Sequence, residues 1–203
     1  MAMEIRRTGM LLIISGPSGT GKGTLIGKLM SSDPSICFSC SVTTRAPRVG
    51  EVDGVHYHFL DEESYDRLLA EDAFLEHAVV HGHRYGTLKS EVENQLEQGM
   101  HVLLDIDPQG ALNVMKKVED YVSVFILPPS FNALRVRLHT RNTDDPVEIE
   151  RRLNNARGEI KNISRYQYAI VNDDLELAFT QLQHIVIGEK QRTNRFFPTI
   201  SEE

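Results

Sequence analysis

Residues 10–24 join an uninterrupted apolar run directly to a glycine-rich loop that carries one lysine. Consecutive apolar residues without polar alternation predict a strand covered on both faces, as is usual in a parallel sheet with helices on both sides. Glycines let backbone N–H groups turn towards phosphate oxygens, and the helix that we expect at residues 23–30 adds the partial positive charge of its N-terminus. The pattern predicts a nucleoside triphosphate-binding loop made of Gly16, Pro17, Ser18, Gly19, Thr20, Gly21, Lys22, Gly23 and Thr24.

One position of this loop departs from the usual pattern. Lys22 is expected to reach the β- and γ-phosphates, and the next residue normally supplies a hydroxyl that binds Mg²⁺. Here that residue is Gly23, and the first hydroxyl belongs to Thr24. We expect Mg²⁺ to bind together with the nucleotide, while direct ligation by Thr24, as opposed to a contact through water, stays open.

Charge and composition exclude several classes of protein. The chain has 203 residues, of which 40% are hydrophobic, and this suits one well-packed α/β domain with small insertions. A net charge of −7 argues against long nucleic-acid partners, because these bind mainly to positive fields. No apolar stretch approaches the ~20 residues of a membrane span, and residues 1–9 lack the apolar region of a signal peptide. We therefore expect a cytoplasmic protein that binds neither nucleic acid nor membrane.

Apolar runs followed by helical patterns recur along the chain. They predict a parallel sheet with crossover helices and with strands at residues 10–14, 102–106, 122–127 and 168–171. Residues 38–88 break this rhythm, because they are polar and contain short strand-like runs at 55–60 and 74–80. This stretch is expected to form an inserted lobe with β-structure. Within the strand-like residues 36–42, Cys37 and Cys40 are expected on opposite faces as inert thiols.

Residues 134–163 predict two helices joined by a polar segment at 142–146. The second helix has a clear start, with Asp145 as N-cap and Pro146 in its first turn. Its apolar residues are spaced alternately by four and three positions, the pattern of one buried stripe. These residues are Ile149, Leu153, Ala156, Ile160 and Ile163.

Two groups of charged residues have the chemistry to meet an anion and a metal. Arg45 and Arg48 lie in a turn-forming context within an acidic protein, and arginine presents a fixed fork of donors that matches phosphate oxygens. Taken alone, two such arginines are more often solvated surface charges. Asp105 and Asp107 end a buried strand, at the edge where α/β sheets bind ligands and where a metal would be held. Asp107 can instead cap the helix that begins near Pro108.

Seven motifs occur in an order that closely resembles the guanylate kinase family: GPSGTGKGT, SVTTRAPRVGEVDGVHYHF, FLEHAVVHGHRYGT, LLDIDPQGA, RLHTRNT, ERRL and IVNDDL. The resemblance covers residues 10–190. It implies the α/β parallel-sheet core of P-loop nucleoside monophosphate kinases, a β-containing GMP-binding insertion at residues 39–92 and a helical lid at residues 141–157 that closes over ATP. The implied activity is transfer of the γ-phosphoryl group of ATP to GMP, with Mg²⁺ as cofactor, in purine nucleotide metabolism.

The resemblance also implies roles for individual residues. The catalytic residues would be Lys22, Arg48, Arg141 and Arg152, of which the last two come from the lid. The GMP phosphate would be held by Arg45, Arg48, Tyr57 and Tyr85, and guanine and ribose by Ser41, Glu76 and Thr87 with Asp105 or Asp107. The adenine of ATP would be flanked by Asn172 and Asp173. Mg²⁺ would be held by Thr24 and Asp107, directly or through water.

Glu76 gives the implied guanine preference a physical basis. Guanine offers a carboxylate two donors, N1–H and N2–H₂, whereas adenine has an acceptor at N1 and no amine at position 2. Against adenine, Glu76 would leave a buried charge unpaired, which carries a large penalty. ATP and GMP are therefore the expected substrates, with dGMP as a further acceptor, and we expect a monomer or a small homo-oligomer.

Three other functions agree with parts of the sequence. A non-catalytic guanylate-kinase-like interaction module would share the fold but has no use for an intact loop lysine, Lys22. A GTPase switch is suggested by the D-x-x-G pattern of residues 107–110, but the chain lacks an Asn-Lys-x-Asp motif. A kinase for another phosphorylated acceptor, such as a ribose bisphosphate, stays open, although the residues placed for guanine favour GMP.

Overall fold

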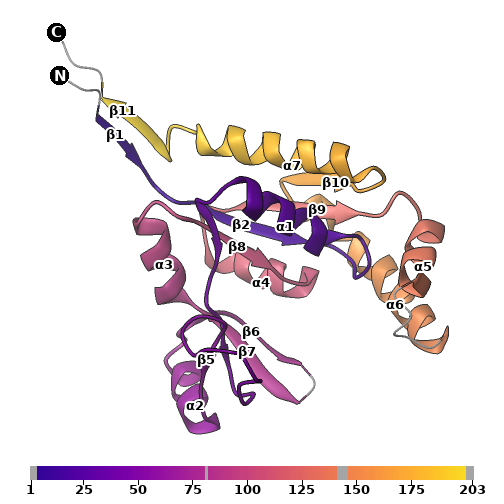
Figure 1. Ribbon diagram of the computed structural model, residues 1–203, viewed down its shortest axis with the longest axis horizontal. Coiled ribbons are helices and arrows are strands. Elements are labelled where there is room, and N and C mark those ends of the chain that lie inside the picture. The colour runs from indigo at the N-terminus through magenta and orange to yellow at the C-terminus, as the bar shows by residue number, and fades with distance from the viewer. Residues whose placement is uncertain (1–3, 81, 141–145, 200–203) are drawn as a thin grey trace.

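A five-stranded parallel sheet lies at the centre of the molecule, with the strand order β10-β9-β2-β8-β3 (Figure 1). The computed structural model describes residues 4–80, 82–140 and 146–199. The sheet consists of β2 (Leu11–Ser15), β3 (Ile36–Phe38), β8 (His101–Asp105), β9 (Val122–Leu127) and β10 (Tyr168–Val171). The four strands predicted from apolar runs are confirmed, and two of them are shifted along the chain by one residue.

Both faces of this sheet are buried, which explains why residues 10–14 are apolar without alternation. Leu12 and Ile14 pack in a cluster with α1 (Lys22–Ser32) and α7 (Leu175–Lys190). Leu11 and Ile13 point to the other face and pack with α3 (Lys89–Glu97) and α4 (Pro108–Lys117). Figure 1 shows the two helix pairs on opposite sides of the sheet. Because the strands are parallel, their carboxyl ends meet at one edge, and that edge positions the candidate site.

A four-stranded sheet with the order β5-β4-β7-β6 forms a separate lobe, below the main sheet in Figure 1. Its strands are β4 (Val42–Thr43), β5 (His58–Phe59), β6 (Phe74–Val80) and β7 (His83–Leu88). The helix α2 (Glu62–Ala70) covers it, and Tyr65 of α2 stacks on Phe74 with ring centroids 4.7 Å apart. The strand predicted at residues 74–80 is thus confirmed.

The strand expected at residues 55–60 is wrong except at residues 58 and 59. Residues 52–56 form a turn, in which the amides of Val55 and His56 both donate to the carbonyl oxygen of Val52. Val55 therefore lies in a turn, where alternation carries no information about a sheet, whereas Phe59 belongs to β5.

The single strand expected at residues 36–42 is also wrong. β3 and β4 belong to different sheets, and residues 39–41 lead the chain from the core into the lobe. Cys37 and Cys40 therefore do not alternate across one strand. Both are free thiols, and burial raises the pKa of each above its ordinary value, which agrees with the expected inert chemistry.

A β-bulge at Leu75 connects the lobe to the core. The register of β6 against β7 shifts between Phe74 and Glu76. Consecutive residues therefore point to different places: Phe74 is buried in the cluster of the lobe, and Leu75 in a cluster of the main core. Glu76 then lies opposite Thr87 of β7. The bulge thus fixes the lobe to the core and places Glu76 next to a polar side chain.

The two helices expected between residues 134 and 163 are present as α5 (Phe131–Thr140) and α6 (Pro146–Ile160), followed by the short 3₁₀ helix η1 (Ile163–Arg165). One hydrophobic cluster joins α5 and α6, formed by Leu134, Leu138, Ile149, Leu153 and Ala156. Ile160 and Ile163 pack against the main core. The predicted stripe is therefore buried in two places, and α6 connects the helical pair to the core. Asp145, the expected N-cap, lies outside the described residues.

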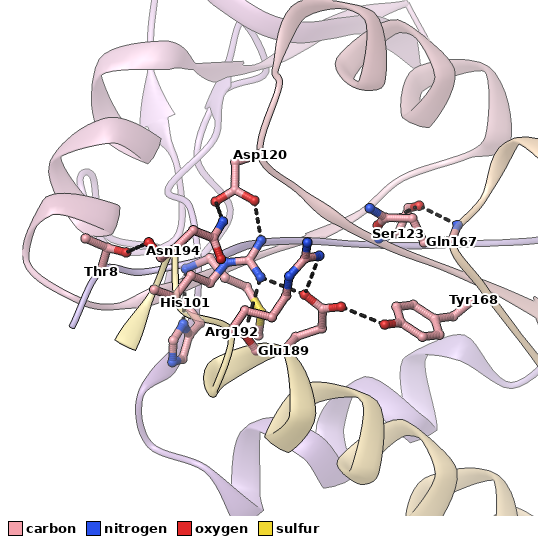
Figure 2. A network of polar contacts seen from close by, with 11 residues as sticks. Thr8, His101, Asp120, Ser123, Gln167, Tyr168, Glu189, Arg192 and Asn194 are labelled. Carbon is pink, nitrogen blue, oxygen red and sulfur yellow. Dashed lines mark hydrogen bonds and ion pairs between the residues drawn. The ribbon is translucent and has the colours of Figure 1, made fainter. Parts of the chain in front are cut away.

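The buried Arg195 holds the segment after α7 against the core, and Figure 2 labels its two acidic partners, Asp120 and Glu189. Arg195 is 1% exposed, and its guanidinium contacts the carboxylates of Glu189, at 2.6 Å, and of Asp120. Tyr168 of β10 donates to the same Glu189 carboxylate at 2.6 Å. Burial acts to raise the pKa of Glu189, but the hydrogen bonds from Tyr168 and Arg195 outweigh it, and the pKa lies below its ordinary value.

The chain ends of the described part form a small ribbon of their own. β11 (Phe196–Thr199) pairs antiparallel with β1 (Glu4–Arg7), and Figure 1 shows this ribbon extending away from the main sheet. Among the helices that the structure describes, none combines the length and the apolar character needed to cross a bilayer.

Candidate active site

The loop between β2 and α1 has a backbone that glycine adopts far more easily than other residues. Gly16 and Gly21 have φ angles of 138° and 90°. A Cβ at Gly16 would lie 2.2 Å from the carbonyl oxygen of Ile126, and one at Gly21 would lie 2.4 Å from Nδ2 of Asn172. The loop can therefore hold its backbone close to a ligand only as long as these positions are glycine.

This loop lines a cavity of about 390 Å³, which we call the phosphate cavity. Its other lining residues include Lys22, Asp105, Asp107 and Glu159. α1 begins at Lys22, so the free N–H groups of its first turn lie beside the cavity. Nζ of Lys22 donates to the carbonyl oxygen of Gly16 at 2.7 Å, and the lysine is thus held along its own loop.

The two aspartates of the predicted carboxylate pair both line the phosphate cavity. Asp105 is the last residue of β8 and lies opposite Ile14 of β2. Burial raises the pKa of Asp105, while the positive charge of Lys22 opposes this shift. Asp107 is the N-cap of α4, because its Oδ1 accepts a hydrogen bond from the Gly110 N–H at 2.7 Å. The capping alternative is therefore confirmed for Asp107, although the residue also reaches the cavity.

A second cavity, of about 400 Å³, lies between the loop and α5, and we call it the α5 cavity. Thr24, Arg137, Asn172 and Asp173 line it. Thr24 lines this cavity, whereas Gly23 lines the phosphate cavity. Of the two residues expected to hold Mg²⁺, Thr24 thus lines the α5 cavity and Asp107 lines the phosphate cavity, and the two cavities adjoin at Gly19 and Gly21.

Asn172 holds the loop in addition to lining the α5 cavity. Its side chain is buried, and Nδ2 donates to the carbonyl oxygen of Thr20 at 2.8 Å. The backbone carbonyl oxygen of Asn172 accepts a hydrogen bond from Nη2 of Arg137 at 2.8 Å. Asn172 thus ties the loop to the end of β10 and to α5.

Three of the four residues expected to bind a phosphate in the lobe form one cluster. Nη2 of Arg45 donates to both carboxylate oxygens of Glu51, at 2.8 and 3.0 Å, and the guanidinium lies 5.5 Å from the ring centroid of Tyr57. Tyr57 and Tyr85 meet edge to face at 5.9 Å. The hydrogen bonds from Arg45 hold the pKa of Glu51 below its ordinary value. Arg48 donates its backbone N–H to Glu51 at 2.7 Å, and its side chain is exposed.

Glu76 and Thr87, both expected to contact guanine, form a hydrogen-bonded pair on neighbouring strands. Oγ1 of Thr87 donates to Oε1 of Glu76 at 2.9 Å. Burial raises the pKa of Glu76, and the hydrogen bond from Thr87 acts in the opposite direction but is the smaller effect. The carboxylate is therefore partly desolvated and is oriented by one donor.

A third cavity, of about 400 Å³, lies between the core and the lobe, and we call it the lobe cavity. Ser41 and Tyr57 line it together with Asp105. Asp105 therefore faces both the lobe cavity and the phosphate cavity. The structure thus brings the carboxyl end of β8 between the two places where ligands were expected.

The helical pair reaches the loop through Arg152, which donates from Nη2 to Oγ of Ser18. Arg141, the other arginine expected from the lid, lies outside the described residues. Two further site residues were not identified from the sequence. Glu51 orients Arg45, and Glu159 faces the phosphate cavity from α6. Glu159 follows Arg152 by seven residues, which places both on one side of the helix, so this spacing was a usable signal.

Comparison with known proteins gives one consistent family. The family model for guanylate kinase matches residues 8–189. A guanylate kinase of Clostridium perfringens is 48% identical over 194 residues, which are 96% of this chain and 90% of that protein. One of Caldanaerobacter subterraneus is 46% identical over 193 residues, 95% of this chain and 94% of that protein. The crystal structure of guanylate kinase from Anaplasma phagocytophilum aligns with a TM-score of 0.69 at 36% identity and covers 96% of this chain and 93% of its own.

Proposed function

The chain belongs to the guanylate kinase family, and from this membership we propose how its residues transfer the γ-phosphoryl group of ATP to GMP. The reaction converts ATP and GMP into ADP and GDP. One observation supports the placement of the two nucleotides above all others: Asp105 lines both the phosphate cavity and the lobe cavity. Direct transfer requires that donor and acceptor sites meet in this way.

We place the triphosphate of ATP in the phosphate cavity and its adenine in the α5 cavity. Gly19 and Gly21 line both cavities, so one nucleotide can extend across the loop from one to the other. Backbone N–H groups of the loop and the N-terminus of α1 would bind phosphate oxygens. Lys22 would exchange the carbonyl oxygen of Gly16 for the β- and γ-phosphates, and Asn172 and Asp173 would lie beside the adenine.

We place GMP between the lobe and the core. Guanine would present N1–H and N2–H₂ to Glu76, whose carboxylate Thr87 already orients. Ser41 would also contact guanine, and Asp105 would lie near the ribose. The phosphate would be bound by Arg45, Arg48, Tyr57 and Tyr85. Glu51 would keep the fork of Arg45 in one orientation, which lowers the entropic cost of binding.

The acidic lining of the phosphate cavity fits Mg²⁺. This ion prefers oxygen ligands, and it is usually bound by one or two carboxylates together with nucleotide phosphates and several water molecules. Asp105 and Asp107 would hold it, whereas Thr24 lines the α5 cavity. When bound, the ion would supply positive charge that neutralises the phosphate oxygens of ATP during transfer of the γ-phosphoryl group.

The segment 141–157 would act as the lid and move onto the donor. Arg152 already contacts Ser18 of the loop and would move to the transferring phosphoryl group together with Arg141. Phosphoryl transfer depends on in-line positioning and on neutralising charge, so Lys22, Arg48, Arg141 and Arg152 suffice as the catalytic set. Closure of the lid would also exclude water, which would otherwise hydrolyse ATP.

A coupled assay of ADP formation tests this function. GMP, dGMP, AMP, CMP and UMP are compared as acceptors, with Mg²⁺ and with EDTA. We expect the highest kcat/KM with GMP, measurable turnover of dGMP, and no turnover in EDTA. Equal turnover of AMP and GMP would contradict the guanine assignment, and no ADP with any acceptor would favour an interaction module. A cytoplasmic location, a role in purine nucleotide metabolism and a monomeric or small oligomeric state stay predictions.

A further inference from the structure

Glu159 is a half-buried carboxylate to which the reaction above gives no role. It lies in the last turn of α6 and lines the phosphate cavity beside Lys22 and Asp107. Within residues 4–80, 82–140 and 146–199 its carboxylate forms no hydrogen bond or ion pair. Burial raises the pKa of Glu159, the charge of Lys22 opposes this shift, and the charge of Asp107 adds to it. Because Glu159 faces the phosphate cavity, its carboxylate can contact a ligand that binds there.

The charges around the phosphate cavity conflict with a bare triphosphate. Three carboxylates face it from three elements: Asp105 from β8, Asp107 from the start of α4 and Glu159 from α6. Among the described lining residues, Lys22 supplies the positive side-chain charge. Each carboxylate repels a phosphate at close range. A divalent cation bound with the nucleotide would convert this repulsion into attraction, so the lining would favour the metal-bound form of the nucleotide.

α6 presents two different charges to the loop along one side. Arg152 contacts Ser18, and Glu159 faces the cavity of the same loop two turns later. Between them, Leu153 and Ala156 bury the helix in its cluster with α5. The contacts of α6 therefore place a donor for phosphate oxygens at Ser18 and an acceptor at the wall of the phosphate cavity.

We propose that Glu159 is a positioning residue for nucleotide-bound Mg²⁺ and that its carboxylate accepts hydrogen bonds from water molecules bound to the ion. The inference rests on the proposed use of Mg²⁺·ATP. Mg²⁺ keeps several of its waters when it binds to proteins, and groups that hold such waters orient the ion without contacting it.

The test measures nucleotide binding without turnover. Dissociation constants of a non-hydrolysable ATP analogue are determined by titration calorimetry, with saturating Mg²⁺ and with EDTA, for the wild type and for Glu159→Gln. In EDTA we expect the variant to bind the analogue about 2–5-fold more tightly, because one repulsive charge is gone. With Mg²⁺ we expect weaker binding than in the wild type, so that the gain in affinity due to the metal shrinks about tenfold.

Two further variants control the experiment. Glu150→Gln makes the same charge change on the outer side of α6, where Glu150 pairs with Arg135 at 3.1 Å, and it should keep the full gain due to the metal. Glu159→Asp keeps the charge on a shorter side chain and should recover part of the gain. Thermal unfolding checks that each variant is folded.

Three outcomes would overturn the inference in different ways. A wild type that binds the analogue equally well with and without Mg²⁺ would contradict the proposed metal itself. If Mg²⁺ increased the affinity of Glu159→Gln for the analogue as much as it does in the wild type, the metal would bind as proposed but Glu159 would not contact its water molecules. An equal loss of affinity in Mg²⁺ and in EDTA would show that Glu159 orients Lys22 and not the ion.

Discussion

Arg45 and Glu76 are each held by a neighbouring side chain before a nucleotide binds. Glu51 accepts two hydrogen bonds from Arg45, and Thr87 donates one to Glu76. A side chain that is already fixed loses less conformational entropy when it binds its ligand. In the proposed GMP site, recognition would therefore depend on pairs of side chains, and in one pair the partner, Glu51, need not touch the substrate.

Replacing Glu76 with Gln should lower kcat/KM for GMP by about a hundredfold or more, because an amide offers one acceptor and one donor where guanine needs two acceptors. The smaller activity with AMP should change much less. Steady-state kinetics with both acceptors measure this, with Glu63→Gln as the control, since Glu63 is an exposed glutamate of the same lobe. Unchanged kinetics with GMP would remove Glu76 from the guanine site.

The raised pKa of Glu76 predicts a pH dependence of GMP binding. A carboxyl with a raised pKa takes up its proton at a higher pH than an ordinary glutamic acid, and only the ionised form accepts from both guanine donors. The affinity for GMP should therefore fall as the pH decreases towards that raised pKa, while the stability contribution of this group rises over the same interval. Titrations of GMP at several pH values measure the effect, and Glu76→Gln should lack this limb although the GMP phosphate still titrates.

Replacing Lys22 with Met should lower turnover by about two to four orders of magnitude and leave the fold intact. The side chain lies at the wall of a cavity and is not part of a hydrophobic cluster. Steady-state kinetics and circular dichroism measure the two effects. A variant that no longer folds would show that the bond from Lys22 to Gly16 stabilises the loop itself.

Among the elements, strands covered on both faces were predictable and those whose pairing is set by the lobe were not. Apolar runs in the sequence predict the central strand β2 and its neighbours. Burial on both faces removes the alternation of apolar and polar residues. The residues of β4 and β5 carry no such signal, since each strand has two residues and is defined by its partners in space. The break after β3 was missed for the same reason.

The candidate site likewise contains residues that could be predicted from the sequence and residues that could not. The loop around Lys22 was predictable, because its glycines and the flanking elements are contiguous in sequence. Which cavity Thr24 lines depends on the direction in which α1 leaves the loop, and the role of Glu159 depends on where α6 packs. Neither follows from local propensity. The helical periodicity of α6 did contain the position of Glu159 relative to Arg152.

The contact between α7 and the segment after it predicts a large effect on stability. Arg195→Met should lower the free energy of unfolding by about 3–5 kcal/mol, because it leaves the buried carboxylate of Glu189 without its main cation. Urea denaturation measures this. Arg192→Met removes an exposed cation 3.4 Å from the same carboxylate and should cost less than about 1 kcal/mol. Equal losses in both variants would contradict a special role for the buried pair.

For the molecule as a whole, the lobe and the lid should approach each other when both nucleotides bind. The lobe and the lid are separate insertions on one core. Each nucleotide gains contacts with its own insertion only when that insertion has moved. Spin labels at Val49→Cys and Val147→Cys, both at exposed positions, report the distance in a Cys37→Ser, Cys40→Ser background. We expect the shortest distance with GMP and an ATP analogue together. The same distance without ligand, with either nucleotide and with both would show that the site is preformed.

The order of strands in the main sheet has a consequence for how the protein is made. β2 lies in the middle of this sheet, yet it comes first among its strands in the chain, and its two neighbours β8 and β9 come much later. On the ribosome, the apolar residues of β2 leave the exit tunnel long before either neighbour has been translated. The nascent chain therefore carries an apolar strand without its sheet neighbours until residue 127 has emerged, and an exposed apolar strand of this kind favours aggregation.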